Sequence, residues 1–541
     1  MNDTKAQTIL TGGRIWCGAR AGFAQALAIR DGRVAAVASN ADGLAGPGTR
    51  SIDLRGRLAV PGFYDAHMHL LPLGLAQREV DVRPEAAPTM DDLIARVRER
   101  AAGLAPGEWI YGRGYDHFLL PGRRHPSRDA LDRAAPDNPV YLKRCCGHMG
   151  VANTRALELA GIDEATPEPD GGHIGREDGR LTGLLQERAQ GAVFAAMPPP
   201  SPDDLVAAIE DGGRRLLSNG ITSAMDAGVG MRAGFAEIEA YRRALSERRL
   251  PVRAYLCLLG GPEGIVEEAH ARGLVTGAGD ERMKVGPVKL FTDGSAGGRT
   301  AAMREPYLGD DGGRGIFCYA DEEVNAMALD YHAKGYQLGV HAIGDAAIDQ
   351  TLAAVRSALD KAPAEGRRHR IEHCGYIHSE QIAEMKRLGM VPVPQPVFMY
   401  QFGDAYVDVL GEARPASAYP MASWIRAGLR PAMSSDAPVS DFSPFLNLYA
   451  ALTRASATGR VLGADERIGV ADALTAMTYN GAYASFDERG RGTLEAGKAA
   501  DVAVLSDDVF RIDLEEILET RADLTLLAGE VVHDRLGEVA D

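Results

Sequence analysis

The feature that most constrains this chain is a regular alternation of short apolar runs with amphipathic helical segments between residues 58 and 440. Apolar runs rich in β-branched residues and separated by helices are typical of parallel sheets built from strand–helix–strand units. Helical segments such as 202–220, 321–335 and 378–389 start near Asp or Ser and end at Gly, as capped helices do. We count eight strand-like runs, at 58–70, 220–228, 252–260, 286–295, 336–345, 368–377, 389–396 and 429–440. Eight such strands predict an α/β fold, a closed (β/α)8 TIM barrel.

The two ends of the chain are rich in strand-like sequence instead. Residues 8–16, 24–39 and 49–60 alternate apolar and polar positions, with a hairpin-type Asp31-Gly32 turn, and residues 500–508 and 523–534 are similar. We therefore expect both termini to form one small accessory β-sandwich, from residues 1–60 and 487–541, beside a barrel domain over 61–486.

About 150 residues separate the first two barrel runs, whereas loops in such units usually take ~2–6 residues. This spacing predicts an inserted subdomain at about 75–200. A segment inserted after a barrel strand leaves from the C-terminal face, where active sites of this fold lie. We expect the insertion to act as a lid over a substrate pocket.

The charge and cysteine content indicate which partners and which compartment to expect. With 59 basic and 75 acidic residues the net charge is −16, which disfavours nucleic acid and anionic membranes. The chain has no signal-like N-terminus and no apolar stretch of the ~18 residues needed to span a membrane. Its six cysteines show no paired spacing, which favours reduced thiols in the cytoplasm. We expect a cytoplasmic protein with a small-molecule substrate, and a homodimer as an assembly to be tested.

Side chains able to bind metal recur near the C-terminal ends of the predicted barrel strands, so they should converge on one mouth. His67 and His69 are two apart and share a face of the first strand; alone, such a pair is weak evidence. The full set is His67, His69, Lys289, His341, His373 and Asp436.

Four imidazoles and a carboxylate suit Zn²⁺ or a similar cation. Lys289 does not suit a metal as an ammonium group, which has no lone pair. A carbamate formed from Lys289 and carbon dioxide would remove this difficulty, because it is an anion able to bridge two metals.

The segments PGFYDAHMHL, VKLFTDGS, VHAIGD, IEHC and SDAPV occur in this order on these strands. Together they resemble the amidohydrolase superfamily, and in particular the amidohydrolase family 3 branch that includes N-substituted formamide deformylases. The resemblance covers nearly the whole chain. It implies two divalent metal ions, expected to be zinc: His67, His69 and Asp436 hold one, His341 and His373 hold the other, and carboxylated Lys289 bridges them.

The activity implied by the resemblance is hydrolysis of a non-peptide C–N bond (amide, formamide or cyclic amide) by a metal-activated water, with Asp436 moving the proton to the leaving nitrogen. A deaminase or an esterase on the same metals stays an alternative, because fold and ligands do not separate these reactions. A non-catalytic homologue is a further alternative, although such a protein should lack the ligands. The segment 293–297 approaches a serine-hydrolase elbow but has Asp293 in place of the first glycine.

Substrate contacts are harder to predict from the sequence. His148 projects from a glycine-flanked turn in the insertion, and Arg299 follows the Lys289 strand, so we expect His148 to contact substrate and Arg299 to bind an anionic group. Tyr115, Asp116 and Gln186 are further lid residues that could reach the pocket. Cys374 should face away from His373 and pack against helices.

Overall fold

Seven parallel strands form the central sheet of the structure, a computed structural model that describes residues 5–309 and 312–537. They follow one another in chain order around the barrel, each pairing in parallel with the next. In β8, β15, β18, β19 and β20 every residue is buried, as expected for strands covered on both faces. The seven are β8 (Phe63–Met68), β15 (Ile221–Val229), β16 (Arg253–Leu259), β17 (Met283–Phe291), β18 (Leu338–Ala342), β19 (Arg370–His373) and β20 (Val391–Val393).

The eighth predicted run closes the barrel without forming a regular strand. On one side Ala432 N–H donates to Pro392 O at 3.0 Å, and on the other Asp436 N–H donates to His67 O at 2.7 Å. The segment next to it contains Pro392 and Pro394, whose carbonyls accept hydrogen bonds but which have no N–H to return. A reciprocal ladder therefore cannot form there. The TIM-like barrel predicted from the sequence is confirmed.

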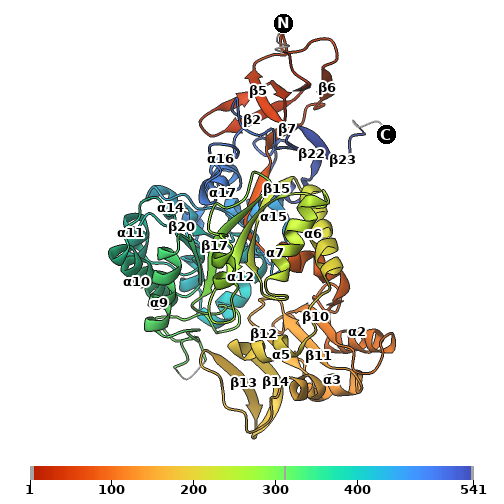
Figure 1. Cartoon of the computed structure of the whole chain (residues 1–541), viewed down its shortest axis with the longest axis vertical. Coiled ribbons are helices and arrows are strands. Elements are labelled where there is room, and N and C mark those ends of the chain that lie inside the picture. The colour runs from red at the N-terminus through yellow and green to blue at the C-terminus, as the bar shows by residue number, and fades with distance from the viewer. Residues whose placement is uncertain (1–4, 310–311, 538–541) are drawn as a thin grey trace.

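Helices cover the outside of the barrel (Figure 1). At the start of α6 the Ser201 hydroxyl accepts a hydrogen bond from Asp204 N–H, and the Asp204 carboxylate accepts one from Ser201 N–H, a capping box before Pro202 at the first turn. The apolar face of α6, including Leu205 and Ile209, is buried in the main core. The longer barrel helices are α6 (Pro202–Leu217), α7 (Ala236–Ser246), α9 (Asp321–Ala333), α10 (Asp345–Lys361), α11 (Ser379–Arg387), α12 (Val397–Leu410) and α15 (Pro444–Thr453).

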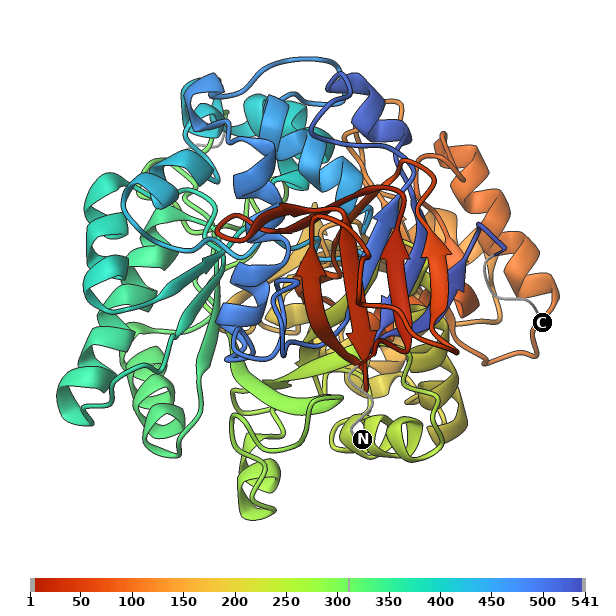
Figure 2. The same ribbon diagram turned by 90° about the horizontal axis from the view of Figure 1, so that it is seen from above.

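The two termini meet in one β-sandwich, as predicted. Figure 2 shows strands from the beginning and the end of the chain side by side, and β21 pairs antiparallel with β7, placing Val504 opposite Ala59. Both sheets share one apolar core with residues from both ends, among them Leu10 and Leu524. One sheet contains β5 (Arg33–Ala38), β4 (Ala26–Arg30), β1 (Thr8–Thr11) and β6 (Arg50–Asp53), and the other β23 (Glu530–Asp534), β22 (Ala522–Leu527), β21 (Val502–Leu505), β7 (Leu58–Pro61), β2 (Arg14–Gly18) and β3 (Gly22–Ala24).

The chain between β8 and β15 contains a sheet of its own, at the end of the molecule opposite the sandwich (Figure 1). Helix α2 (Met90–Ala102) and α3 (Arg128–Ala134) pack with it around a separate apolar core. The sheet has the order β13 (Gly172–Glu177), β14 (Arg180–Glu187), β12 (Met149–Ala152), β11 (Val140–Arg144), β10 (Ile110–Tyr115) and β9 (Val80–Asp81). An insertion after the first barrel strand is therefore present, and the exact domain limits stay a prediction.

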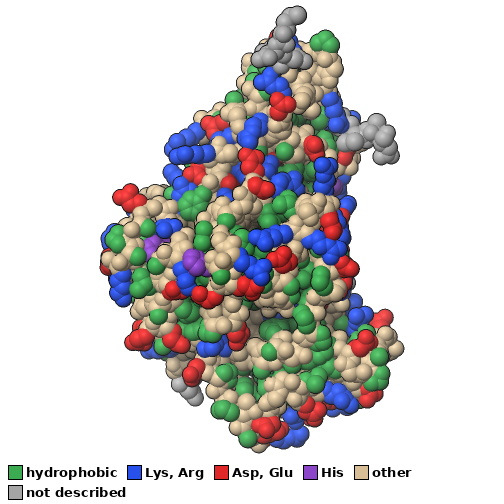
Figure 3. All heavy atoms as spheres, in the orientation of Figure 1, with side chains coloured by type: hydrophobic (Ala, Val, Ile, Leu, Met, Phe, Trp, Pro, Cys, Tyr) green, Lys and Arg blue, Asp and Glu red, His purple; other side chains and the backbone are tan. Residues whose placement is uncertain are grey.

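Basic and acidic side chains are interspersed on the face of the molecule seen in Figure 3. None of the helices in the described ranges combines the length and the hydropathy that a membrane crossing requires.

Candidate metal centre and active site

Three predicted ligands converge at the C-terminal end of β8. His67 lies in β8, His69 follows that strand, and Asp436 lies in the segment that closes the barrel. The Nε2 atoms of His67 and His69 are 3.4 Å and 3.2 Å from Asp436 Oδ1. One ligand atom of each residue lies within 4.8 Å of the other two, which is the spacing expected around a single cation.

The surroundings of His67 and Asp436 show whether their facing atoms could bind a cation. His67 Nδ1 lies 2.6 Å from Glu372 Oε2. Glu372 also accepts hydrogen bonds from Arg370 Nε at 2.7 Å and Nη2 at 2.8 Å, so it is an ionised acceptor. The ring proton of a neutral His67 is therefore on Nδ1, and its Nε2 lone pair points to Asp436. Asp436 Oδ1 is buried and has no hydrogen-bond donor among the described residues; a cation between these atoms would satisfy all of them.

The second predicted pair lies beside the first. The rings of His341 and His373 have centroids 4.4 Å apart, and His373 is 4.9 Å from His67. Burial holds the pKa of both His341 and His373 well below the ordinary value, so both are neutral, as metal ligands must be. His373 Nδ1 is 2.8 Å from Gln395 Oε1. The Nε2 atom of His341 lies 3.1 Å from the carbonyl oxygen of Gly294, so the structure does not bring this nitrogen into the His67, His69 and Asp436 cluster.

Lys289 lies on β17 at the floor of the same site, with 1% of its surface exposed. Its Nζ atom is 3.3 Å from His67 Nε2 and stands over the ring of Phe291 at 4.9 Å. Burial lowers the pKa of Lys289 below the ordinary lysine value. A larger fraction of this amine is therefore uncharged, which is the form that reacts with carbon dioxide.

Backbone strain accompanies these ligands. His373, Cys374 and Asp436 have positive φ angles of 67°, 54° and 59°, a region that non-glycine residues occupy at a cost and that is common in functional sites. Cys374 is fully buried against Met385, with 3.7 Å between the two sulfur atoms, so it packs away from the site as the sequence predicted.

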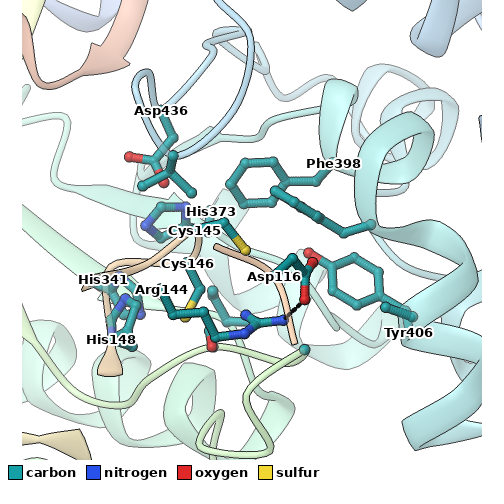
Figure 4. Close-up of a pocket in the computed structure, with 16 residues that line it drawn as sticks. Asp116, Arg144, Cys145, Cys146, His148, His341, His373, Phe398, Tyr406 and Asp436 are labelled. Atoms are coloured by element: carbon teal, nitrogen blue, oxygen red, sulfur yellow. Dashed lines mark hydrogen bonds and ion pairs between the residues drawn. The ribbon is translucent and has the colours of Figure 1, made fainter. Parts of the chain in front are cut away.

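A cavity opens between the barrel mouth and the insertion, with about 440 Å³ of empty space when the solvent-open mouth is included. Its floor includes His341, His373 and Asp436, and the side chains of Phe398 and Tyr406 form part of one wall (Figure 4). The insertion contributes the roof through Asp116, Arg144, Cys145, Cys146 and His148. The predicted position of the insertion over the site is thus seen in the lining of the cavity.

His148 is held in place from within the insertion. Its Nδ1 atom lies 2.8 Å from Glu187 Oε2, and its ring centroid is 4.7 Å from that of His341. Burial would lower the pKa of His148, but the charge and hydrogen bond of Glu187 outweigh burial and raise it. This arrangement leaves the other ring nitrogen of His148 available as a donor.

Comparison with known proteins agrees with this geometry. The model of the amidohydrolase family matches residues 50–533. The Bacillus subtilis protein YtcJ, named as an amidohydrolase, is 31% identical over 90% of this chain and 91% of its own length. An N-substituted formamide deformylase from Arthrobacter pascens is 29% identical, with 96% of each chain covered. Among solved structures, a metal-dependent hydrolase from Pyrococcus horikoshii OT3 matches with a TM-score of 0.74 and 26% identity, covering 94% of this chain and 99% of that one.

This chain belongs to the amidohydrolase family. Family membership confirms the resemblance seen in the ordered motifs, and it confirms the enzyme class, a metal-dependent hydrolase of C–N bonds other than peptide bonds. The individual ligand roles stay predictions that the geometry makes specific.

The structure of this amidohydrolase also identifies residues that sequence reasoning missed. Glu372 directly precedes His373 in the IEHC motif and orients His67, although a strand neighbour would be expected to face away. Arg144 directly precedes Cys145 in KRCCGHMG and lines the cavity. Arg299, predicted to bind substrate, is not among the described residues that line this cavity.

Of the other lid residues named from the sequence, one lines the cavity and two have partners elsewhere. Asp116 lines the cavity. Tyr115 instead bonds His125 Nδ1 through its hydroxyl at 2.9 Å, and Gln186 lies beside Met149, with 3.9 Å between its Nε2 atom and the sulfur.

Proposed function

We propose that this amidohydrolase binds two divalent cations, zinc by preference, and hydrolyses the C–N bond of a small amide, formamide or cyclic amide. The observation that carries the proposal is the cluster of His67 Nε2, His69 Nε2 and Asp436 Oδ1, three possible ligand atoms that lie close together beside a cavity, with His67 and Asp436 buried and His69 half-buried. Hydrolysis adds water across the bond: oxygen joins the carbonyl carbon, the C–N bond breaks, and the nitrogen leaves as an amine or ammonia.

The spacing of His67, His69 and Asp436 fits one metal, and the neighbouring His341 and His373 supply imidazoles for a second. His67, His69 and Asp436 would hold one cation, His341 and His373 the other, and carboxylated Lys289 would lie between them. Burial lowers the pKa of His69 to about 4, so its imidazole is neutral over the working pH range. When bound, such cations act as Lewis acids and lower the pKa of water.

Asp436 has the position of a proton carrier. Its carboxylate lies close to the Nε2 atoms of His67 and His69, and it lines the cavity that would hold the substrate. An amine leaves far more easily after protonation, so Asp436 would take a proton from water and deliver it to the nitrogen.

His148 and Glu187 would stabilise the developing oxyanion from above. The Glu187 carboxylate fixes the His148 ring and favours its protonated form. A donor held in place before the reaction stabilises charge in the transition state without needing to reorganise. The apolar residues of the cavity wall, including Ile343 and Phe398, limit access of bulk water.

The decisive experiment measures metal content and turnover together. Elemental analysis of protein purified without chelator should find about two divalent ions per chain, and a panel of N-formyl amines, N-acyl amino acids, cyclic imides and aminated heterocycles should reveal an amide substrate. Active protein with no metal would refute the metal centre. Turnover confined to ring amines or esters would instead establish deaminase or esterase chemistry.

Compartment and assembly follow as smaller proposals. All six cysteines are free, and four of them are buried, which supports a reducing compartment such as the cytoplasm. We expect no nucleic-acid partner, on the basis of the net charge of −16. A homodimer is the assembly to test by light scattering.

A further inference from the structure

The roof of the cavity carries an ion pair that the proposed reaction does not use. Arg144 Nη2 donates to Asp116 Oδ1 at 2.7 Å, and the two side chains are 3% and 7% exposed. Both residues line the cavity that contains Asp436. In Figure 4 the pair is joined by a dashed line on the side of the view away from Asp436. A buried ion pair is weak evidence for stability, so its placement over a substrate cavity needs another explanation.

The structure fixes the Arg144 guanidinium from several sides. Its Nε atom donates to His117 Nδ1 at 3.0 Å, and its charge lies 5.6 Å from the ring of Phe118. Burial and the charge of Arg144 lower the pKa of His117 to about 2, so this imidazole is a neutral acceptor. Asp116 is held in turn, because its Oδ1 also accepts from Phe118 N–H at 3.0 Å.

One face of this guanidinium is open to the cavity. Among the described residues its third nitrogen, Nη1, has no oxygen or nitrogen acceptor, and the only other group that hydrogen-bonds the guanidinium is the weakly accepting thiol of Cys146. A Cβ atom on Gly297 would lie 3.9 Å from Nη2 and 4.0 Å from Nη1, so glycine at this cavity-lining position leaves the group uncovered.

From this arrangement we infer that Arg144 is a substrate-binding residue that donates a hydrogen bond to an uncharged acceptor, such as a carbonyl oxygen, on the part of the substrate remote from the scissile bond. The inference rests on the proposed amide hydrolysis and specifies its substrate class. The apolar wall of Phe398, Phe402 and Tyr406 would hold the body of the substrate, and Arg144 would select its far end.

The charge of Asp116 decides between a neutral acceptor and a carboxylate. An anion bound at Nη1 would be attracted by Arg144 and repelled by Asp116, whose carboxylate lies 2.7 Å from the neighbouring Nη2 atom, so part of the ionic gain cancels. The anion would still lose its hydration in a mostly apolar cavity, and this loss is costly. A carbonyl oxygen keeps the hydrogen bond and avoids most of that cost.

Three isosteric substrates test the inference. They are the formamides of benzylamines that carry an isopropyl, an acetyl or a carboxylate group on the ring, each in meta and para forms. Cleavage of the isopropyl compound tests the proposed function alone. For the wild type we expect the acetyl compound to exceed the isopropyl compound by about tenfold in kcat/KM, through KM, as one hydrogen bond from a charged donor supplies. The carboxylate compound should be the poorest of the three.

Variants then locate the effect. Arg144→Gln should reduce the acetyl preference to within about threefold while the isopropyl compound keeps most of its rate. Asp116→Asn keeps the shape and frees the charge of Arg144, so it should improve the carboxylate compound by about tenfold relative to the acetyl compound. Arg426→Gln is the matched control and should leave the three ratios unchanged, because Arg426 pairs with Glu466 at 3.3 Å and is not among the described residues that line the cavity. Arg299→Gln tests the cation favoured by the sequence as the competing binding residue.

The outcomes separate the two proposals. If the wild type cleaves the isopropyl compound with no acetyl preference in either ring position, the inference about Arg144 is wrong and the proposed function stands. If Arg299→Gln abolishes the preference, the binding residue is Arg299 and not Arg144. Should Arg144→Gln fold poorly, the product amines decide the matter as competitive inhibitors of the wild type: the acetyl amine should bind about tenfold tighter than the isopropyl amine, and equal binding would overturn the inference.

Discussion

Replacing Glu372 by glutamine tests how far one buried carboxylate supports both metal binding and the stability of the barrel. Glu372 is fully buried and receives three close contacts, from His67 Nδ1 at 2.6 Å, Arg370 Nε at 2.7 Å and Arg370 Nη2 at 2.8 Å. Glutamine has the same shape, but only one of its two terminal atoms accepts. One of the three donors then faces an NH₂ group, and Arg370, 1% exposed, loses its counter-ion.

Two effects of different size should follow. Removing one partner of a buried ion pair costs about 3–5 kcal/mol of stability. Losing the acceptor that fixes a ligand histidine weakens metal binding by about 10- to 100-fold. We therefore expect Glu372→Gln to lower both the free energy of unfolding and the affinity for zinc, measured by denaturant titration and by competition with a chromogenic chelator.

A double variant distinguishes positioning from general damage. Replacing both Arg370 and Glu372 by Met and Leu removes the unpaired charge and should recover much of the stability. His67 would still lack its acceptor, so the affinity for zinc should stay low. Glu488→Gln is the matched control. Glu488 forms an ion pair of 2.7 Å with Arg368, and this pair does not contact the metal site. Both the stability and the zinc affinity of this variant should stay near wild type. If Glu372→Gln binds zinc as tightly as the wild type, Glu372 does not orient His67.

Three further substitutions test the roles assigned at the site. Lys289→Ala should lose bound metal and turnover together, because the proposed bridging carbamate could not form; full metal occupancy with normal turnover, by elemental analysis and assay, would refute the carbamate. Asp436→Asn keeps one coordinating oxygen but cannot carry a proton, so much of the metal should remain while kcat falls by about 10²–10⁴-fold; near-normal kcat would assign the proton to another group. His148→Gln should keep the metal and lower kcat by about 10²–10³-fold with little change in KM, the loss expected for one oxyanion donor; a rise in KM alone would make His148 a ground-state binding residue instead.

Much of the fold followed from local sequence patterns. The runs around β8, β15 and β17 alternate with amphipathic helices, and this periodicity depends only on neighbouring residues. The histidines at 67 and 69 and Asp436 were predictable for the same reason, because strand ends in a parallel barrel share one face. The eighth run was predicted as a strand but does not form a regular one, because Pro392 and Pro394 in the neighbouring segment have no N–H groups for a regular ladder of hydrogen bonds.

The amino-acid sequence by itself therefore determined the barrel, the insertion and the set of candidate ligands, because each depends on a periodic pattern or on a position at a strand end. Only the tertiary structure showed which residues, distant in the sequence, contact the candidate ligands and the other residues of the cavity. Glu372 reaches His67 across 305 positions of chain, and Arg144 reaches Asp116 across 28. Such contacts arise from the packing of whole elements, and the hydrogen bonds and desolvation that give them their chemistry exist only after those elements meet.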